Sequence, residues 1–239
     1  MPPPPRTKAP ARARDPLTRA AIADAALALI DAEGLEALSM RRLGAALGVE
    51  AMALYHHFAS KGELLDAVQE RLLDELDLPP REGLAPLARL RRMITSYRAV
   101  AVRHPPAFAL LAARRFNTER AFAVYESILE AFADLGLDAA QSARWFRLIG
   151  GYAGGAGMAD VASRERVADA TPLVLQRSPQ VVPFPHVRAV APHLTVERLD
   201  AVFEHGLDVL FGALEARLGP ASSARRPAAR RSARKPRPA

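Results

Sequence analysis

Apolar residues recur at intervals of three and four along almost the whole chain, and this period restricts the chain to packed helices. Alternation at every second residue, which would indicate strands, is nearly absent. Val181-Val182 is the one hint of a strand, and it is short and flanked by prolines. We therefore predict an all-α fold, in which capping residues and glycines mark the helix ends.

The two ends of the chain differ in charge from the rest. Residues 1–14 carry four basic residues and no acidic one, and residues 220–239 carry seven and none. The net charge of +7 therefore belongs to the ends. Both are rich in Pro, Ala and Arg, a composition that buries too little apolar surface to fold. We predict two disordered basic tails, which either attract phosphate non-specifically or are simply solvated.

Several classes of protein are excluded by what the sequence lacks. It has no cysteine, so disulfide scaffolds, thiolate metal sites and thiol nucleophiles are ruled out. It shows neither a membrane-length apolar run nor a signal peptide, which predicts a cytoplasmic protein without a membrane partner. Its histidines lack metal-ligand spacing and no catalytic motif is present, so we expect no metal, no cofactor and no enzyme.

Four predicted helices fill residues 15–78. Their ends follow from capping residues, from glycines and from a capping box at Ser60 and Glu63. They run from Asp15-Pro16 to Gly34, from Ser39 to Gly48, from about Glu50 to Phe58, and from Ser60 to Pro79.

The second and third of these helices, with the turn Leu47-Gly48-Val49 between them, match a helix-turn-helix. Leu43, Leu54 and Phe58 would fix the angle between the two helices, and the small residues Ala45 and Ala46 would permit their close approach. The outer face of the third helix is then free to enter a major groove of DNA.

Residues 17–78 resemble the DNA-binding domain of the tetracycline-repressor (TetR) family, most clearly from Gly48 to Ala67. The segment Phe203–Leu218 is similar to the last helix of the tetracycline-repressor type within that family. The resemblance covers most of 17–218, strongly at both ends and loosely between. It implies a helix-turn-helix domain at 15–78 and a ligand-binding and dimerisation domain at 79–219.

The same resemblance implies a set of DNA contacts. They are Arg41, Ala51, Met52, Ala53, Tyr55, His56, His57 and Lys61. The chemistry of several agrees, because arginine reaches guanine O6/N7 or phosphate and a lysine at a helix start suits phosphate. Ala-Met-Ala at 51–53 predicts apolar contacts, as with thymine methyl groups. Alternatives stay open: Arg41 as a solvated surface residue, and His56 or His57 as packed ones.

Whole-domain charge does not favour DNA binding, because residues 15–78 hold five basic and twelve acidic residues. Only a local basic face can attract phosphate, and we assign it to Arg41, Arg42, Lys61 and Arg19. We therefore expect the tail at 1–14 to supply a large share of the non-specific affinity.

The second half holds longer predicted helices, at about 83–103, 107–113, 119–135, 138–162 and 196–218, with a proline-rich loop and at most one broken helix over 163–194. The last helix has two adjoining apolar stripes, which fits a helix shared between its own core and a partner. Gly206 and Gly212 would let a neighbouring helix approach. The resemblance implies a homodimer built on this helix and the 138–162 helix.

Aromatic residues cluster in the middle of the chain, and they form either part of a core or the wall of a pocket. By resemblance the ligand-binding residues are Met93, Tyr97, Phe108, Leu111, Tyr125, Ile128, Trp145 and Ile149. Leu111 falls where tetracycline-binding members have a metal-binding histidine, so we expect a more apolar ligand. The glycines within 150–157 would serve close helix contact or a helix that bends on ligand binding.

These features favour a homodimeric DNA-binding regulator, a repressor that a small, largely apolar effector releases from a palindromic operator. Two alternatives remain: a non-inducible or architectural DNA-binding protein with basic tails, and a helical ligand binder that has lost DNA binding. Preference for one palindrome over random DNA separates the first reading from these.

Overall fold

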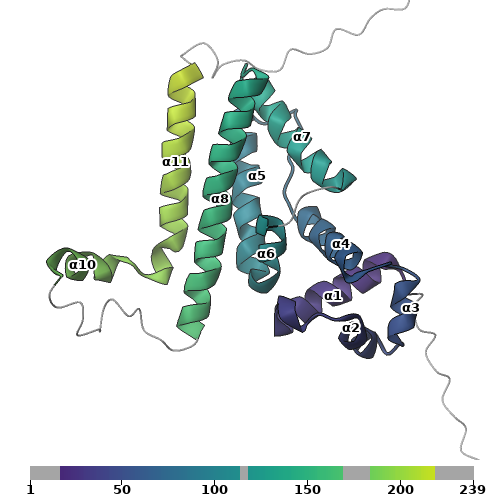
Figure 1. The fold of residues 1–239 in the computed structure, drawn as a ribbon. Helices are drawn as coiled ribbons and strands as arrows, with labels where there is room; N and C mark the ends of the chain where they lie inside the picture. Colours follow the sequence, from purple (N-terminus) through teal and green to yellow (C-terminus); the bar gives the residue numbers. More distant parts are fainter. Residues whose placement is uncertain (1–16, 114–117, 169–183, 219–239) are drawn as a thin grey trace, which may run out of the picture.

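The computed structural model describes residues 17–113, 118–168 and 184–218, and within them every regular element is helical, which confirms the all-α prediction (Figure 1). The longer helices are α1 (Arg19–Glu33), α2 (Met40–Leu47), α3 (Ala51–Tyr55), α4 (Lys61–Asp74), α5 (Pro86–Arg103), α6 (Pro105–Ala113), α7 (Glu119–Asp134), α8 (Ala139–Ala168), α10 (Pro185–Val190) and α11 (Leu199–Leu218). Both predicted tails and Val181-Val182 lie outside the described residues.

Local capping chemistry sets the ends of the N-terminal helices. The Ser39 hydroxyl accepts a hydrogen bond from the Arg42 amide at 3.2 Å, and Gly48 ends α2 in the left-handed conformation with φ 67°. The Ser60 hydroxyl accepts from the Glu63 amide at 3.2 Å, while the Glu63 carboxylate accepts from the Ala59 amide at 2.8 Å. Each bond satisfies an amide that a helix start leaves without a partner.

Several predicted helix ends are wrong, among them the end of the third helix, which lies at Tyr55 and not at Phe58. The first helix does not begin at Asp15-Pro16, because Thr18 is the N-cap and its hydroxyl accepts from the Ala21 amide at 3.1 Å. The fourth ends at Asp74, where the amides of Glu75 and Leu76 tighten the last turn onto the carbonyls three residues back. The predicted loop at 163–194 begins later, because α8 continues through good helix formers to Ala168.

The helices form two groups joined by α6. In Figure 1, α1 to α4 cluster at one side, with α1 packed on α4 and α3 at the outer edge. On the other side α5, α8 and α11 stand next to one another, and α7 packs on α5 and α8. Helix α6 contacts α1 and α4 of the first group and α5 and α8 of the second. One apolar core runs from α1 through α4 to α6, and a second fills the space among α5, α7, α8 and α11.

Two glycines permit close contacts in the second group. A β-carbon on Gly157 of α8 would lie 2.6 Å from the ring of Phe108, so α6 can pack there only against glycine. A β-carbon on Gly206 would lie 2.0 Å from the Tyr152 hydroxyl, which donates to the Phe203 carbonyl at 2.9 Å. The predicted close approach at Gly206 is thus formed by α8, whereas Gly212 has no atom within 4 Å of its added β-carbon.

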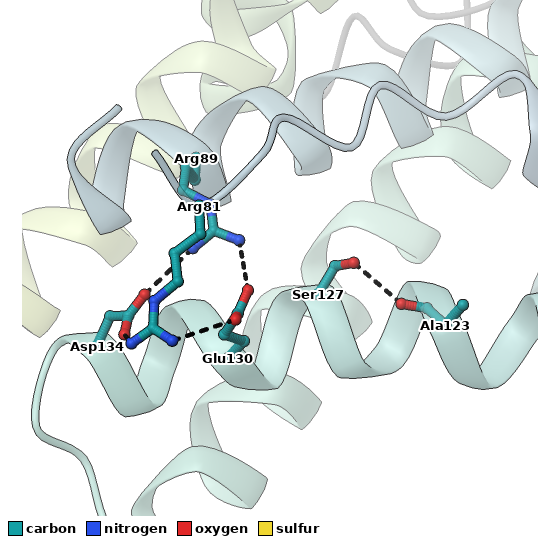
Figure 2. Close-up of polar contacts among 6 residues, drawn as sticks. All are labelled: Arg81, Arg89, Ala123, Ser127, Glu130 and Asp134. Atoms are coloured by element: carbon teal, nitrogen blue, oxygen red, sulfur yellow. Dashed lines mark hydrogen bonds and ion pairs between the residues drawn. The ribbon is translucent and has the colours of Figure 1, made fainter. Parts of the chain in front are cut away.

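A buried ion-pair network fastens α7 to α5. Figure 2 shows the guanidinium groups of Arg81 and Arg89 facing the carboxylates of Glu130 and Asp134. Arg89 is only 2% exposed and donates to Glu130 at 2.9 Å and to Asp134 at 3.2 Å. A guanidinium at this depth is tolerated because two carboxylates face it. The network fixes the end of α7, the helix that forms one wall of the cavity described below.

Candidate DNA-binding face and ligand cavity

Helix α3 presents one face to the core and the other to solvent. Leu54 and, just beyond the helix, Phe58 are fully buried. Met52 is 65% exposed and Tyr55 is 44% exposed, whereas Ala51 and Ala53 are half-buried. Large apolar and aromatic side chains kept in solvent on such a short helix indicate a contact surface, because the protein's own core would otherwise have taken them up.

The close approach of α2 and α3 depends on a residue that the sequence reasoning did not single out. A β-carbon on Gly44 would lie 2.8 Å from the Val49 carbonyl oxygen and 3.2 Å from the Ala51 amide nitrogen. Ala45 and Ala46, which we expected to permit this contact, are both exposed. The helix phase explains the error: Gly44 sits beside the buried Leu43 on the face that meets the turn.

The basic face is narrower than the sequence indicated. Arg42 pairs with Glu33, and Arg19 pairs with Glu63 at 2.8 Å while lying 4.2 Å over the ring of Phe58. The pKa of Glu63 is lowered, first because its carboxylate accepts from the Ala59 amide and then because Arg19 is adjacent. Both arginines therefore form ion pairs within the domain and are less available to bind phosphate.

Two cations remain available on this face. Arg41 and Lys61 are exposed, and neither forms an ion pair with another described residue. Lys61 is the first residue of α4, where helix amides also favour a phosphate. His56 is exposed and His57 is half-buried. The structure thus gathers the predicted contact residues around α3 and the starts of α2 and α4.

A cavity of about 480 Å³ lies among α4, α5, α6, α7 and α8. Six of the eight predicted ligand residues line it: Met93, Tyr97, Leu111, Tyr125, Ile128 and Ile149. The volume lies within the range of small-molecule sites, roughly 300 to 1,000 Å³.

The other two predicted residues lie elsewhere. Phe108 is fully buried and packs edge-on against Tyr97, with ring centroids 5.3 Å apart. Trp145 lines a separate hollow of about 780 Å³ between the α7–α8 turn and the end of α11. Neither residue lines the cavity, because the period of a helix does not reveal which of two neighbouring spaces an aromatic side chain faces.

Several lining residues were missed. Phe146 and Arg147 contribute from α8, together with the glycine wall, which we define as Gly150, Gly151, Gly154 and Gly155. Leu73 and Leu76 at the end of α4 complete the cavity. The glycines were conspicuous in the sequence, and their pairing at a four-residue spacing could have indicated one continuous helical surface.

The polar groups of the cavity are few. Burial raises the pKa of Tyr97 to about 12, with a smaller contribution from Tyr125. The pKa of Tyr125 is also raised by burial. Both hydroxyls therefore stay protonated at neutral pH and cannot act as anions. Tyr125 meets Phe146 edge-on, with ring centroids 5.2 Å apart.

His104 joins the two groups of helices. Its two ring nitrogens lie 2.7 Å from an Asp31 oxygen on α1 and 2.8 Å from a Glu75 oxygen after α4. Its carbonyl accepts from the amides of Ala107 and Phe108, which begin α6. His104 thus connects the start of α6 to α1 and to the end of α4.

The described residues contain neither a cluster of metal ligands nor a membrane-spanning helix. No group of three His, Asp or Glu side chains is placed to hold a metal ion. None of the described helices combines the length and the apolar character needed to cross a membrane.

Comparison with protein families assigns this architecture. Residues 22–68 match the model of bacterial regulatory proteins of the tetR family, and residues 80–218 match the tetracyclin repressor-like C-terminal domain. The chain belongs to the TetR family. The two matches correspond to the helix-turn-helix group and to the group that surrounds the cavity.

Individual TetR-family proteins are similar to this chain in sequence. The chain is 33% identical over 162 residues to the HTH-type transcriptional repressor DrrR1 of Streptomyces coeruleorubidus, covering 65% of this chain and 58% of that protein. It therefore spans less than three fifths of that relative. It is 29% identical to the class G tetracycline repressor protein of Vibrio anguillarum, over 83% of this chain and 94% of that protein.

Solved structures show the same fold. ActR of Streptomyces coelicolor in complex with actinorhodin is 27% identical and superposes with a TM-score of 0.70, covering 86% of this chain and all of that chain. The fold of this chain is thus that of a TetR-family protein with a known small-molecule complex.

Proposed function

We propose that this TetR-family regulator is a homodimeric repressor that binds a palindromic operator and leaves it when a small, largely apolar effector fills the 480 Å³ cavity. One observation carries the proposal. Helix α4 begins at the DNA-binding face with Lys61 and ends at the cavity with Leu73, and Leu76 just beyond the helix also lines the cavity. A ligand in the cavity therefore touches an element that also contacts DNA.

The α3 face supports a defined mode of DNA reading. Met52, with Ala51 and Ala53 on either side, offers apolar contact to thymine methyl groups. Tyr55 and His57 can donate to phosphate oxygens, as can the exposed His56. Arg41 reaches a guanine edge or a phosphate, and Lys61 a phosphate. An operator rich in thymine at the central contact positions follows from this set.

Dimerisation is supported by apolar side chains left exposed on two adjacent helices. They are Leu148 on α8 and Val202 and Val209 on α11. A second copy packed on these helices would cover them and would hold two α3 helices at a fixed distance. One turn of DNA, about 34 Å, separates the half-sites that such a pair reads.

Effector release requires different affinities in two states. A ligand shifts DNA binding only if it binds the DNA-free arrangement more tightly than the DNA-bound one. The cavity wall includes both α4 and α6, the latter through Leu111. A ligand that displaces these helices would change the spacing of the two α3 helices in the dimer.

The DNA-binding half of the proposal is tested with the intact chain and a random duplex library. We expect one palindrome to be enriched and to bind about 10³-fold more tightly than random DNA. Tyr55→Ala should weaken binding to that palindrome roughly tenfold, at the scale of one lost hydrogen bond to a charged group. Phe122→Ala, which removes an exposed aromatic side chain from α7, is the matched control and should bind normally.

Two outcomes would count against the proposal. Equal affinity for all duplexes would favour an architectural DNA-binding protein. Identical binding by the Tyr55→Ala and Phe122→Ala variants would mean that DNA is contacted by another face.

A further inference from the structure

The charges around the cavity have one sign only. Among the described lining residues Arg147 is the sole ionised side chain and none carries a carboxylate. Arg147 is exposed at the edge of the cavity and forms no ion pair with another described residue. A cationic ligand would enter this apolar space without a counter-charge, and burying an unpaired charge is strongly unfavourable.

The hydroxyls in the cavity do not change this balance. Tyr97 stays protonated well above neutral pH, since burial raises its pKa to about 12. It can donate a hydrogen bond to a carbonyl or an anion, but it cannot neutralise a cation. The cavity therefore suits a neutral or anionic molecule.

The glycine wall leaves open space beside the backbone of α8. None of its four members has a positive φ. A β-carbon on Gly150, Gly151 or Gly155 would meet no atom within 4 Å, and one on Gly154 would meet only the Tyr97 hydroxyl, at 3.9 Å. Each glycine within a helix costs about 1 kcal/mol relative to alanine. Bare helix backbone on the wall of an open cavity leaves room for a flat molecule to lie against it.

Aromatic groups complete the surroundings. Tyr97, Tyr125 and Phe146 line the cavity with the glycine wall. A planar ring system can lie on the glycines and meet these side chains at their edges, an arrangement that aromatic pairs favour. Met93 and Met158 add adaptable thioethers.

We propose, resting on the proposed function, that the effector is a planar aromatic organic acid whose rings lie on the glycine wall and whose acidic group pairs with Arg147. The guanidinium offers a planar pair of N–H donors that matches a carboxylate. This assigns Arg147 as the residue that selects anionic effectors over neutral and cationic ones.

Calorimetric titration of the full chain with three matched probes tests the assignment. The probes are anthraquinone-2-carboxylate, its neutral carboxamide and the cationic 2-(aminomethyl)anthraquinone. We expect the carboxylate to bind about tenfold more tightly than the carboxamide, the scale of a charge-assisted hydrogen bond. The cation should bind more weakly than either.

Two substitutions assign the effect to residues. Arg147→Gln should lower the affinity for the carboxylate to that for the carboxamide and leave the carboxamide unchanged. Arg144→Gln is the matched control, because Arg144 lies on the same helix and lines the other hollow. Gly154→Ala should weaken the carboxylate and the carboxamide alike, at least fivefold, without lowering the melting temperature.

The inference is overturned if the carboxylate does not bind, if the carboxamide or the amine binds as tightly, or if Arg147→Gln behaves like Arg144→Gln. Release of the selected palindrome, measured in parallel, separates this inference from the proposed function. Anion-selective binding without DNA release would support the inference and contradict the proposed function. Release of the palindrome by the neutral or cationic probe alone would support the proposed function and contradict this inference.

Discussion

At the scale of single residues, Gly44 decides whether the helix-turn-helix can close. Replacing it with alanine would place a β-carbon 2.8 Å from the Val49 carbonyl oxygen, a backbone atom that cannot move without opening the turn. We expect Gly44→Ala to lower the free energy of unfolding by about 1–3 kcal/mol, the usual cost of overpacking. Chemical denaturation of the full chain measures the change.

Gly62→Ala in α4 is the comparison for this substitution, since its added β-carbon meets only the Ser60 hydroxyl, at 3.4 Å. It should leave stability unchanged or raise it slightly, because alanine is the better helix former. Equal effects of the two substitutions would show that the contact between α2 and the turn is not tight.

Sequence reasoning was accurate at several positions where one residue determines the local structure, although not at Asp15-Pro16. Ser39, Gly48 and Ser60 act as predicted because capping depends on neighbours within four residues. The prediction of cavity-lining residues failed where packing between helices that are distant in sequence decides which residues of a helix face the cavity. Phe108 and Arg147 show this: the first packs into the core beside Gly157, and the second borders the cavity.

At the scale of helices, α6 and the residue before it connect the DNA-binding group to the cavity. His104 faces a carboxylate at each ring nitrogen, Asp31 on one side and Glu75 on the other. Buried Gln69 of α4 donates to the Leu110 carbonyl of α6 at 3.0 Å. These bonds and the shared apolar core mean that α1, α4 and α6 move together.

We therefore predict that His104→Leu loosens α1 and α4 selectively. Hydrogen exchange of the full chain, followed by mass spectrometry, should show faster exchange in peptides of α1 and α4, with α5 and α8 unchanged. The reason is that the imidazole ring between the two carboxylates is lost while the second core stays intact. His193→Gln, on an exposed turn before α11, provides the baseline. A uniform increase across all helices would argue against a local joint.

At the scale of the whole molecule, charge is divided between the ends and the folded body. The domain that reads DNA is acidic overall, and two of the four cations assigned to its basic face, Arg19 and Arg42, are paired with carboxylates. Among the described residues of its DNA-binding face, Arg41 and Lys61 are the exposed cations that form no ion pair. Such a surface needs an additional source of attraction to phosphate.

Deletion of residues 1–14 should therefore reduce the slope of log K against log salt for DNA binding by roughly 3–4 for each tail engaged, because four cations are removed. Titration of a fluorescent duplex at several salt concentrations gives the slope. Deletion of the uncharged segment Pro2–Pro5 alone should leave it unchanged. An identical slope in the full chain and in the longer deletion would show that residues 1–14 do not contribute to DNA affinity.

The central claim is that two copies of the chain hold two α3 helices one DNA turn apart. The absence of cysteine allows a direct test, because Ala46→Cys on the exposed side of α2 gives one spin-label site per copy. Pulsed electron paramagnetic resonance on the complex with the selected palindrome should give a single narrow distance distribution, consistent with α3 helices about 34–36 Å apart. No dipolar coupling between labels, which would mean one copy per duplex, would contradict the claim.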